Sequence, residues 1–308
     1  MAVLLLLVGL ALLVGGAELL VRGGGQLALG LRIPAMIVGL TVVAFGTSAP
    51  ELAVSVSAAW KGSTDAAMGN VLGSNVANVL LVLGVGSMVK PLAVDRGLLK
   101  RDLPALLLLQ LLLPLLCLDG QVGWIDGLVL LGLCAVYNAI LIRQALKERS
   151  ASFEEEPDLP KTRLWLDALF LLLGLGALVG GAQLFVGSAL EVASSLGLSD
   201  RFVGLTVIAL GTSAPELVTT AIGAWKGEVD LALGNVVGSN IFNLALVLGM
   251  TAVLHPIVFN DPALWGDIAV ACGVTVLLVP IALFAGRIGR VFGGVMFGSY
   301  VLYLFLSS

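Results

Sequence analysis

Long apolar runs, separated by short polar or glycine-rich segments, fill almost the whole chain of 308 residues. About twenty consecutive apolar residues cross a bilayer as an α-helix, and this length divides the chain into ten predicted spans. The spans cover residues 2–21, 34–60, 65–88, 101–118, 123–146, 164–187, 202–225, 230–254, 263–285 and 289–306. The pattern therefore predicts an all-α polytopic membrane protein with ten transmembrane helices.

The composition supports this class, because 59% of the residues are hydrophobic and only 12% are charged, with a mean hydropathy of +1.08. Soluble domains carry roughly a quarter charged residues, so a soluble fold is excluded. The sequence has no P-loop, no GxGxxG run and no CxxC pair. We therefore expect no nucleotide, no bound cofactor, no nucleic-acid partner and no enzymatic activity.

Two halves of the chain are copies of one another. A shift of 165 residues lays 37–84 on 202–249 with 30 identities in 48 positions. The long polar segment 147–163 then reads as a linker between a first half, 1–146, and a second half, 164–308. Since each half holds five predicted spans, an odd number, the second copy must cross the membrane in the opposite direction. The expected architecture is two inverted five-helix repeats, as in many secondary transporters.

The basic residues predict the orientation, because cytoplasmic loops carry an excess of Lys and Arg. With the amino terminus external, all of the sixteen Lys and Arg residues except Lys61 and Arg201 fall on the cytoplasmic side. We therefore expect a plasma (inner) membrane protein with both termini external and the 147–163 linker cytoplasmic. Glu18 lies one turn before Arg22 near the cytoplasmic end of the first span, and we expect a helix-end ion pair there.

The sequence Gly-Thr-Ser-Ala-Pro-Glu occurs at 46–51 and again at 211–216, each time inside an apolar run. A proline in a helix interior removes a backbone hydrogen bond and breaks or kinks the helix. A carboxylate near the bilayer centre costs roughly 2.5–3.5 kcal/mol on insertion scales, and such residues usually mark function. Both halves are therefore predicted to contain a broken motif helix that carries an intramembrane glutamate.

A second repeated motif follows, Gly-Ser-Asn-x-x-Asn at 73–78 and 238–243. When the inverted copies face each other, both motifs bring oxygen ligands to one centre without sulfur or imidazole, and such a set suits Ca²⁺ or Na⁺. The alternative for the hydroxyls is a hydrogen bond to their own helix backbone. The candidate ligands are Thr47, Ser48, Glu51, Ser74, Asn78, Thr212, Ser213, Glu216, Ser239 and Asn243.

At these motifs the chain strongly resembles the sodium/calcium exchanger family of cation/calcium antiporters, as a compact prokaryote-type member. The resemblance implies exchange of Ca²⁺ for Na⁺ by alternating access, with Glu51 and Glu216 as principal cation ligands. It further implies that the backbone carbonyls of Ala44 and Ala209 coordinate Na⁺. Many relatives, notably potassium-dependent ones, carry Asp at the position of Asn243.

The neutral Asn243 predicts transport that is independent of K⁺. Two alternatives within the same class stay open, an H⁺/Ca²⁺ exchanger and a K⁺-dependent Na⁺/Ca²⁺ exchanger. A cation channel is the alternative from another class, and it would not require a counter-ion. The expected partners are Ca²⁺, Na⁺ and the lipid bilayer, whereas stoichiometry, affinity, direction of transport and oligomeric state do not follow from the sequence.

Overall fold

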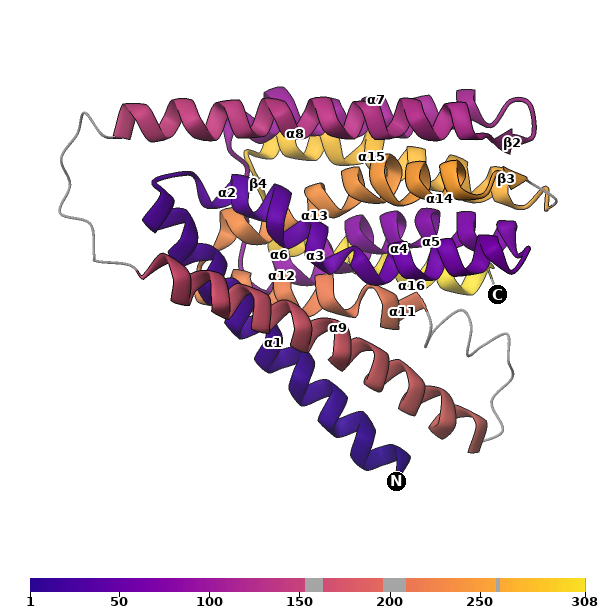
Figure 1. Ribbon diagram of the computed structural model, residues 1–308, viewed down its shortest axis with the longest axis horizontal. Coiled ribbons are helices and arrows are strands. Elements are labelled where there is room, and N and C mark those ends of the chain that lie inside the picture. Colours follow the sequence, from indigo (N-terminus) through magenta and orange to yellow (C-terminus); the bar gives the residue numbers. More distant parts are fainter. Residues whose placement is uncertain (153–162, 196–208, 259–260, 308) are drawn as a thin grey trace.

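The computed structural model describes residues 1–152, 163–195, 209–258 and 261–307, and these residues are almost entirely helical (Figure 1). In the first half the segments, with η for π-helical turns, are α1 (Ala2–Leu31), α2 (Ala35–Val38), η1 (Gly39–Val43), α3 (Ala44–Thr47), α4 (Ala49–Trp60), α5 (Thr64–Ala77), η2 (Asn78–Val82), α6 (Leu83–Val89), η3 (Leu98–Asp102), α7 (Leu103–Leu116) and α8 (Trp124–Ser152). In the second half they are α9 (Leu164–Ser195), α11 (Ala209–Thr212), α12 (Ala214–Lys226), α13 (Val229–Phe242), η5 (Asn243–Val247), α14 (Leu248–Leu254), α15 (Leu264–Ala285) and α16 (Arg290–Ser307).

Within the described residues, six helices are long and apolar enough to span a membrane, and the bent pair Ala35–Thr47 and Ala49–Trp60 would make a seventh. In two of the six, Thr64–Val89 and Val229–Leu254, 83% of an 18-residue apolar stretch is buried inside the protein. In each of the other four helices that share is 28%. These two helices, which carry the Gly-Ser-Asn motifs, therefore form the centre of the bundle. The others surround them and present apolar side chains outward, as expected in lipid.

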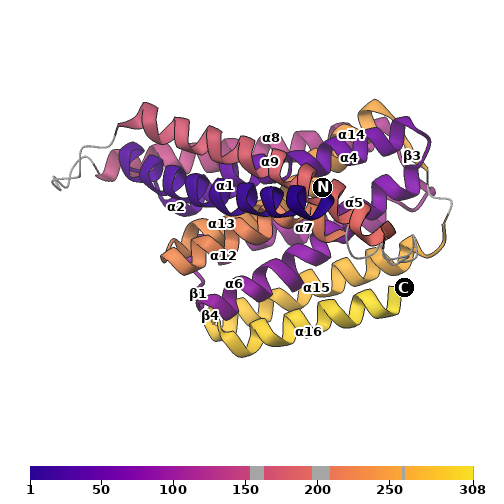
Figure 2. The same ribbon diagram turned by 90° about the horizontal axis from the view of Figure 1, so that it is seen from below.

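Helices α1 and α9 lie side by side and cross the rest of the bundle obliquely (Figures 1 and 2). A Cβ atom added to Gly16 would lie 2.8 Å from the Gly174 carbonyl oxygen, and one added to Gly23 would lie 2.7 Å from the Asp167 carbonyl oxygen. Glycines thus let the two backbones approach closely, as small residues do in membrane helix pairs. Residue numbers rise along α1 as they fall along α9, so the two helices are antiparallel.

In the part of the chain that the structure describes, four two-residue strands interrupt the predicted all-helical pattern: β1 (Leu92–Ala93), β2 (Gln121–Val122), β3 (Ile257–Val258) and β4 (Arg287–Ile288). β1 pairs with β4 and β2 pairs with β3, both antiparallel, with Leu92 opposite Ile288 and Val122 opposite Ile257. Each pair joins a connection of the first half to one of the second half. The ladders satisfy backbone groups of inter-helix connections, and segments of two residues are too short for sequence periodicity to reveal.

Three predicted boundaries differ from the structure. Helix α1 continues past the charged Arg22, which suggested its end, to Leu31, and the Arg22 guanidinium lies over the Phe170 ring of α9 at 5.3 Å. Helix α8 extends through Ser152 into the predicted linker, and α9 extends to Ser195. Residues 153–162 of the linker and 202–208 of the seventh predicted span lie outside the described residues.

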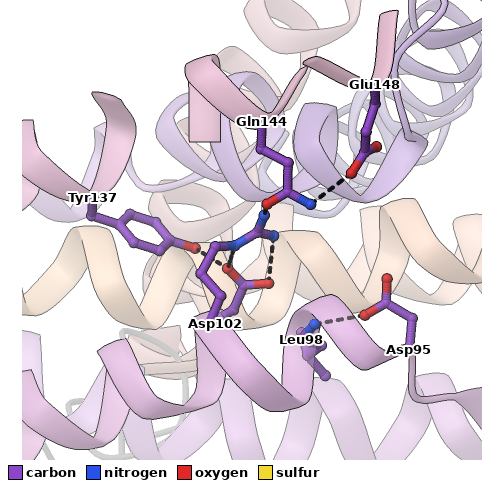
Figure 3. A network of polar contacts seen from close by, with 7 residues as sticks. Asp95, Leu98, Asp102, Tyr137, Gln144 and Glu148 are labelled. Carbon is purple, nitrogen blue, oxygen red and sulfur yellow. Dashed lines mark hydrogen bonds and ion pairs between the residues drawn. The ribbon is translucent and has the colours of Figure 1, made fainter. Parts of the chain in front are cut away.

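A buried polar cluster joins η3 to α8 (Figure 3). The fully buried Asp102 carboxylate accepts hydrogen bonds from Arg101 Nε at 2.6 Å and Nη2 at 2.8 Å, and from the Tyr137 hydroxyl at 3.0 Å. Arg101 Nη1 also donates to Gln144 Oε1, and Gln144 Nε2 donates to Glu148 Oε1 at 2.6 Å. The cluster compensates the buried Asp102 charge and holds the N-terminal end of α7 against α8.

Tyr137→Phe is expected to destabilise the protein, because it removes a hydrogen bond to a buried charged group, worth about 1.5–3 kcal/mol. The measurement is the midpoint of thermal unfolding of the purified protein in detergent. Tyr300→Phe is the matched control, since Tyr300 is also buried but forms no described hydrogen bond. Equal shifts in the two variants would contradict the importance of the Tyr137–Asp102 bond.

Candidate cation site

The two Gly-Thr-Ser-Ala-Pro-Glu motifs break their helices in the same way. Ser48 ends α3 with φ −83° and ψ 1°, and the chain bends by 41° before α4 begins. Ser213 precedes α12 with φ −88° and ψ 7°. Pro50 lies in the first turn of α4, where a missing N–H removes no intrahelical bond. The predicted broken helix is thus confirmed at Ser48, and each motif glutamate falls in the first turn of a new helix.

Glu51 and Glu216 occupy the third position of α4 and α12, where the helix dipole favours a negative charge. Ser followed three residues later by Glu is the pattern of a capping box, in which both side chains bond to backbone N–H groups. Neither Ser48 nor Ser213 makes such a cap hydrogen bond. The helix starts therefore leave these polar side chains for another role.

Both carboxylates are fully buried, and none of their four oxygens has a hydrogen-bond partner among the described residues. The Ser48 and Ser213 hydroxyls and both amide atoms of Asn78 and Asn243 are also buried without a described partner. Leaving one buried polar group unpaired costs about 1–3 kcal/mol, and a buried charge costs more. A bound cation would compensate these oxygens together, whereas no described protein group does so.

The unpaired groups of the two halves lie close together. Glu51 is near enough to Glu216 for electrostatic interaction and lies beside the Ser74 hydroxyl, while Thr47 and Ser48 lie beside Glu216. The π-helical turn η2 packs against α12, and η5 packs against α4. Each asparagine that begins a π-helical turn is therefore on a segment that contacts the glutamate helix of the other half. The two halves thus place two carboxyl groups, several hydroxyls and two side-chain amides close together.

Hydroxyls and amides link the halves around this centre. The Thr47 hydroxyl donates to Asn235 Oδ1 at 3.1 Å and lies 3.3 Å from the Ser239 hydroxyl. Asn235 Nδ2 donates to Thr220 Oγ1 at 3.2 Å. Thr47 is also 3.4 Å from the Ala44 carbonyl, the expected back-bond to its own helix. A long-range hydrogen bond to the other half accompanies that local bond.

Ten of the predicted ligand residues are buried residues of the two breaks and the two central helices: Ala44, Thr47, Ser48, Glu51, Ser74, Asn78, Ser213, Glu216, Ser239 and Asn243. Thr212 ends α11 and is half-buried, and Ala209 begins α11, with its side chain outside the description. The buried Thr219, whose hydroxyl has no described partner, and the linking Asn235 were not in the predicted set.

Within the described residues, no cluster of three or more His, Cys, Asp or Glu side chains could hold a metal. The centre has two carboxylates and is otherwise neutral, so transition-metal ligation does not suit it. Hard cations such as Ca²⁺ accept carboxylate, hydroxyl and carboxamide oxygens. The donor set that the sequence predicts is therefore compatible with the geometry.

Comparisons with known proteins agree along the whole chain. The family described as sodium/calcium exchanger protein matches residues 1–143 and 166–308. CaxA of Alkalimonas amylolytica, named as a candidate antiporter, is 41% identical over 99% of this chain and 98% of its own length. The sodium/calcium exchanger MaX1 of Methanosarcina acetivorans is 30% identical over 98% and 97%.

The fold is similar to that of the sodium-calcium exchanger NCX_Mj in a crystal soaked with Na⁺ and Sr²⁺. The TM-score is 0.86 at 30% identity, with coverage of 100% of this chain and 98% of NCX_Mj. These relatives are transporters by name, not enzymes, and the matches extend through both halves. The chain belongs to the sodium/calcium exchanger family of membrane proteins.

Proposed function

We propose that this protein exchanges Ca²⁺ for Na⁺ across the plasma membrane by alternating access, with both ions binding at the centre around Glu51 and Glu216. The observation that carries this proposal is the pair of fully buried carboxylates without described hydrogen-bond partners. Two negative charges neutralise one Ca²⁺ or two Na⁺. Family membership supports the same pair of ions.

The proposed ligands are the oxygens of both motifs. Ca²⁺ takes six to eight oxygen ligands at roughly 2.3–2.6 Å, and the centre offers two carboxylates, several hydroxyls and two carboxamides. The Ala44 and Ala209 carbonyls are proposed as Na⁺ ligands from the family resemblance alone. The full proposed set is Ala44, Thr47, Ser48, Glu51, Ser74, Asn78, Ala209, Thr212, Ser213, Glu216, Ser239 and Asn243.

The proposed architecture is ten transmembrane helices in two inverted repeats, 1–146 and 164–308, joined by a cytoplasmic linker. The antiparallel packing of α1 on its sequence copy α9 supports the inversion. The strand pairs support it as well. β1 corresponds to β3 and β4 corresponds to β2 in the other half, so exchanging the halves converts the β1–β4 pair into the β3–β2 pair. The π-helical turns η2 and η5 also begin at equivalent asparagines, 78 and 243. The external position of both termini rests on the distribution of Lys and Arg.

Coupling follows from the cost of the empty site. Occluding two uncompensated carboxylates away from water during the switch between access states is costly. Binding Ca²⁺ or enough Na⁺ removes that cost, so only loaded sites should cross readily. A ligand moves such an equilibrium only through different affinities for the two states. Here the difference is between the open and the occluded centre.

A proton-coupled Ca²⁺ exchanger is the second candidate, because unpaired carboxylates can also accept protons. The experiment that separates the candidates is uptake of radiolabelled Ca²⁺ into vesicles loaded with Na⁺, K⁺ or acid. Uptake driven by internal Na⁺ supports Na⁺ coupling, and uptake driven only by internal acid supports the second candidate. Uptake that needs no counter-ion would indicate a channel and contradict both exchangers.

Transport is expected to be independent of K⁺, since Asn78 and Asn243 are both neutral and leave two carboxylates as the charge of the centre. The measurement is Na⁺-driven Ca²⁺ flux with K⁺ replaced by choline, and the expected initial rate is unchanged. Asn243→Asp adds a third carboxylate and is expected to increase cation retention or to introduce sensitivity to K⁺. A large loss of wild-type flux without K⁺ would refute this reading of Asn243.

A further inference from the structure

Asn235 is a fully buried residue of α13 that connects three helices near the centre. Its Oδ1 accepts a hydrogen bond from Thr47 of α3, and its Nδ2 donates to Thr220 of α12. Thr47 and Asn235 belong to different halves, 188 residues apart in the chain. The amide therefore connects a proposed ligand hydroxyl to a helix that carries a proposed ligand carboxylate.

Asn70, the equivalent residue of the first half, indicates how the oxygen and nitrogen of the Asn235 amide are oriented. Asn70 Nδ2 donates to the backbone carbonyl of Glu51 at 3.2 Å and to the Ser55 hydroxyl at 2.9 Å. The Glu51 carbonyl oxygen can only accept, so the Asn70 NH₂ group must face it and the Ser55 hydroxyl that the same nitrogen contacts. Ser55 and Thr220 are equivalent positions under the 165-residue shift. With the same amide orientation in the second half, Asn235 Nδ2 faces Thr220 and Oδ1 faces Thr47.

The direction of the Thr47 proton decides what its oxygen can bind. A threonine hydroxyl has one proton and two lone pairs, and it binds a cation through a lone pair. Because Thr47 lies beside Glu216, its proton would otherwise turn to the carboxylate and occupy an oxygen that the cation needs. The Ser239 hydroxyl, at 3.3 Å, and the Ala44 carbonyl, at 3.4 Å, are more distant acceptors than Asn235 Oδ1, at 3.1 Å.

We infer that Asn235 is a positioning residue, which accepts the Thr47 proton and leaves the Thr47 and Glu216 oxygens available to the transported cation. The inference rests on the proposed function, and it adds a residue outside the proposed ligand set. Its counterpart Asn70 has described bonds to Ser55 and to the Glu51 backbone, and no described bond joins it to a proposed ligand hydroxyl. The two asparagines thus provide a matched pair for a test.

The test compares Asn235→Leu with Asn70→Leu, since leucine keeps the approximate shape and removes the amide. Loss of residues that orient metal ligands typically reduces affinity about 10–100-fold. We expect Asn235→Leu to raise the KM for Ca²⁺ about tenfold or more with little change in maximal rate, and Asn70→Leu to change it far less. A second readout, the rise in melting temperature of detergent-purified protein with added Ca²⁺, should require more Ca²⁺ in Asn235→Leu.

A double substitution separates positioning from general packing. In a Thr47→Ala background there is no hydroxyl to orient, so adding Asn235→Leu should change the KM little further. Equal effects of Asn235→Leu and Asn70→Leu, or a full additional effect in the Thr47→Ala background, would overturn the inference. If Asn235→Leu does not fold, Thr220→Val takes its place in the test, and Ser55→Ala is then the control. Equal KM values for Ca²⁺ in Thr220→Val and Ser55→Ala would also overturn the inference.

The proposed function and the positioning role of Asn235 can be disproved separately. If Ca²⁺ does not raise the melting temperature of the wild-type protein and drives no exchange, the proposed function fails. If the wild type responds to Ca²⁺ while the Asn235 and Asn70 variants respond alike, only the positioning role fails.

Discussion

Glu51→Gln and Glu216→Gln are each expected to abolish Ca²⁺ transport while leaving the protein folded. Glutamine is nearly isosteric with glutamate, but each substitution removes half of the negative charge that faces the cation. Loss of a direct ligand should reduce the Ca²⁺-dependent rate by about a hundredfold or more. In the absence of ions the variants should unfold at the same or a higher temperature than the wild type, because a buried uncompensated charge is removed.

The measurement combines Ca²⁺ uptake in vesicles with thermal unfolding of the same purified variants. Glu191→Gln is the matched control, since Glu191 is exposed on α9 and its equivalent in the first half is already a glutamine, Gln26. The control should transport like the wild type. Full transport by either Glu51→Gln or Glu216→Gln would remove that carboxylate from the cation site.

Acid is expected to inhibit transport strongly at low Ca²⁺ and weakly at saturating Ca²⁺. Protons and Ca²⁺ compete for the same carboxylate oxygens, so protonation lowers the apparent Ca²⁺ affinity and Ca²⁺ binding releases protons. Where a carboxylate titrates, the apparent KM for Ca²⁺ should rise by about tenfold per pH unit for each proton displaced. The sign is fixed: lower pH raises the KM, and the maximal rate is retained.

The measurement is initial flux as a function of pH at low and at saturating external Ca²⁺, with the Na⁺ gradient held constant. Glu191→Gln should show the same profile as the wild type, because an exposed carboxylate away from the centre does not compete for the ion. Inhibition that saturating Ca²⁺ cannot relieve would place the titrating group outside the Glu51–Glu216 centre and defeat this mechanism.

Local sequence rules could predict the broken helix and most of the site. The proline of each motif and the three-residue spacing from Ser48 to Glu51 determine a helix start at which serine and glutamate share the first turn. The repeat could be found because 30 of 48 aligned positions are identical. The burial of Ser74, Asn78, Ser239 and Asn243 follows from their places on the two central helices.

Contacts between distant segments could not be predicted in this way. Glu18 forms its ion pair with Lys226, 208 residues away, at 2.7 Å, and the expected partner Arg22 instead packs on Phe170. The bond from Thr47 to Asn235 likewise depends on how the two halves of the chain pack against each other. The π-helical turns at Asn78 and Asn243 reflect one additional residue per turn inside an apolar helix, a change that hydrophobic periodicity does not register.

If one centre couples Na⁺ and Ca²⁺ movements in opposite directions, as we propose, the most direct test follows both ions together. Purified protein in vesicles loaded with radiolabelled Na⁺ would be diluted into Na⁺-free medium with a second label on Ca²⁺, and Na⁺ efflux and Ca²⁺ uptake recorded simultaneously. We predict that Na⁺ leaves only when external Ca²⁺ is present, that Ca²⁺ accumulates in proportion, and that Glu51→Gln stops both movements. Na⁺ efflux without Ca²⁺, or Ca²⁺ uptake that persists in Glu51→Gln, would contradict the account.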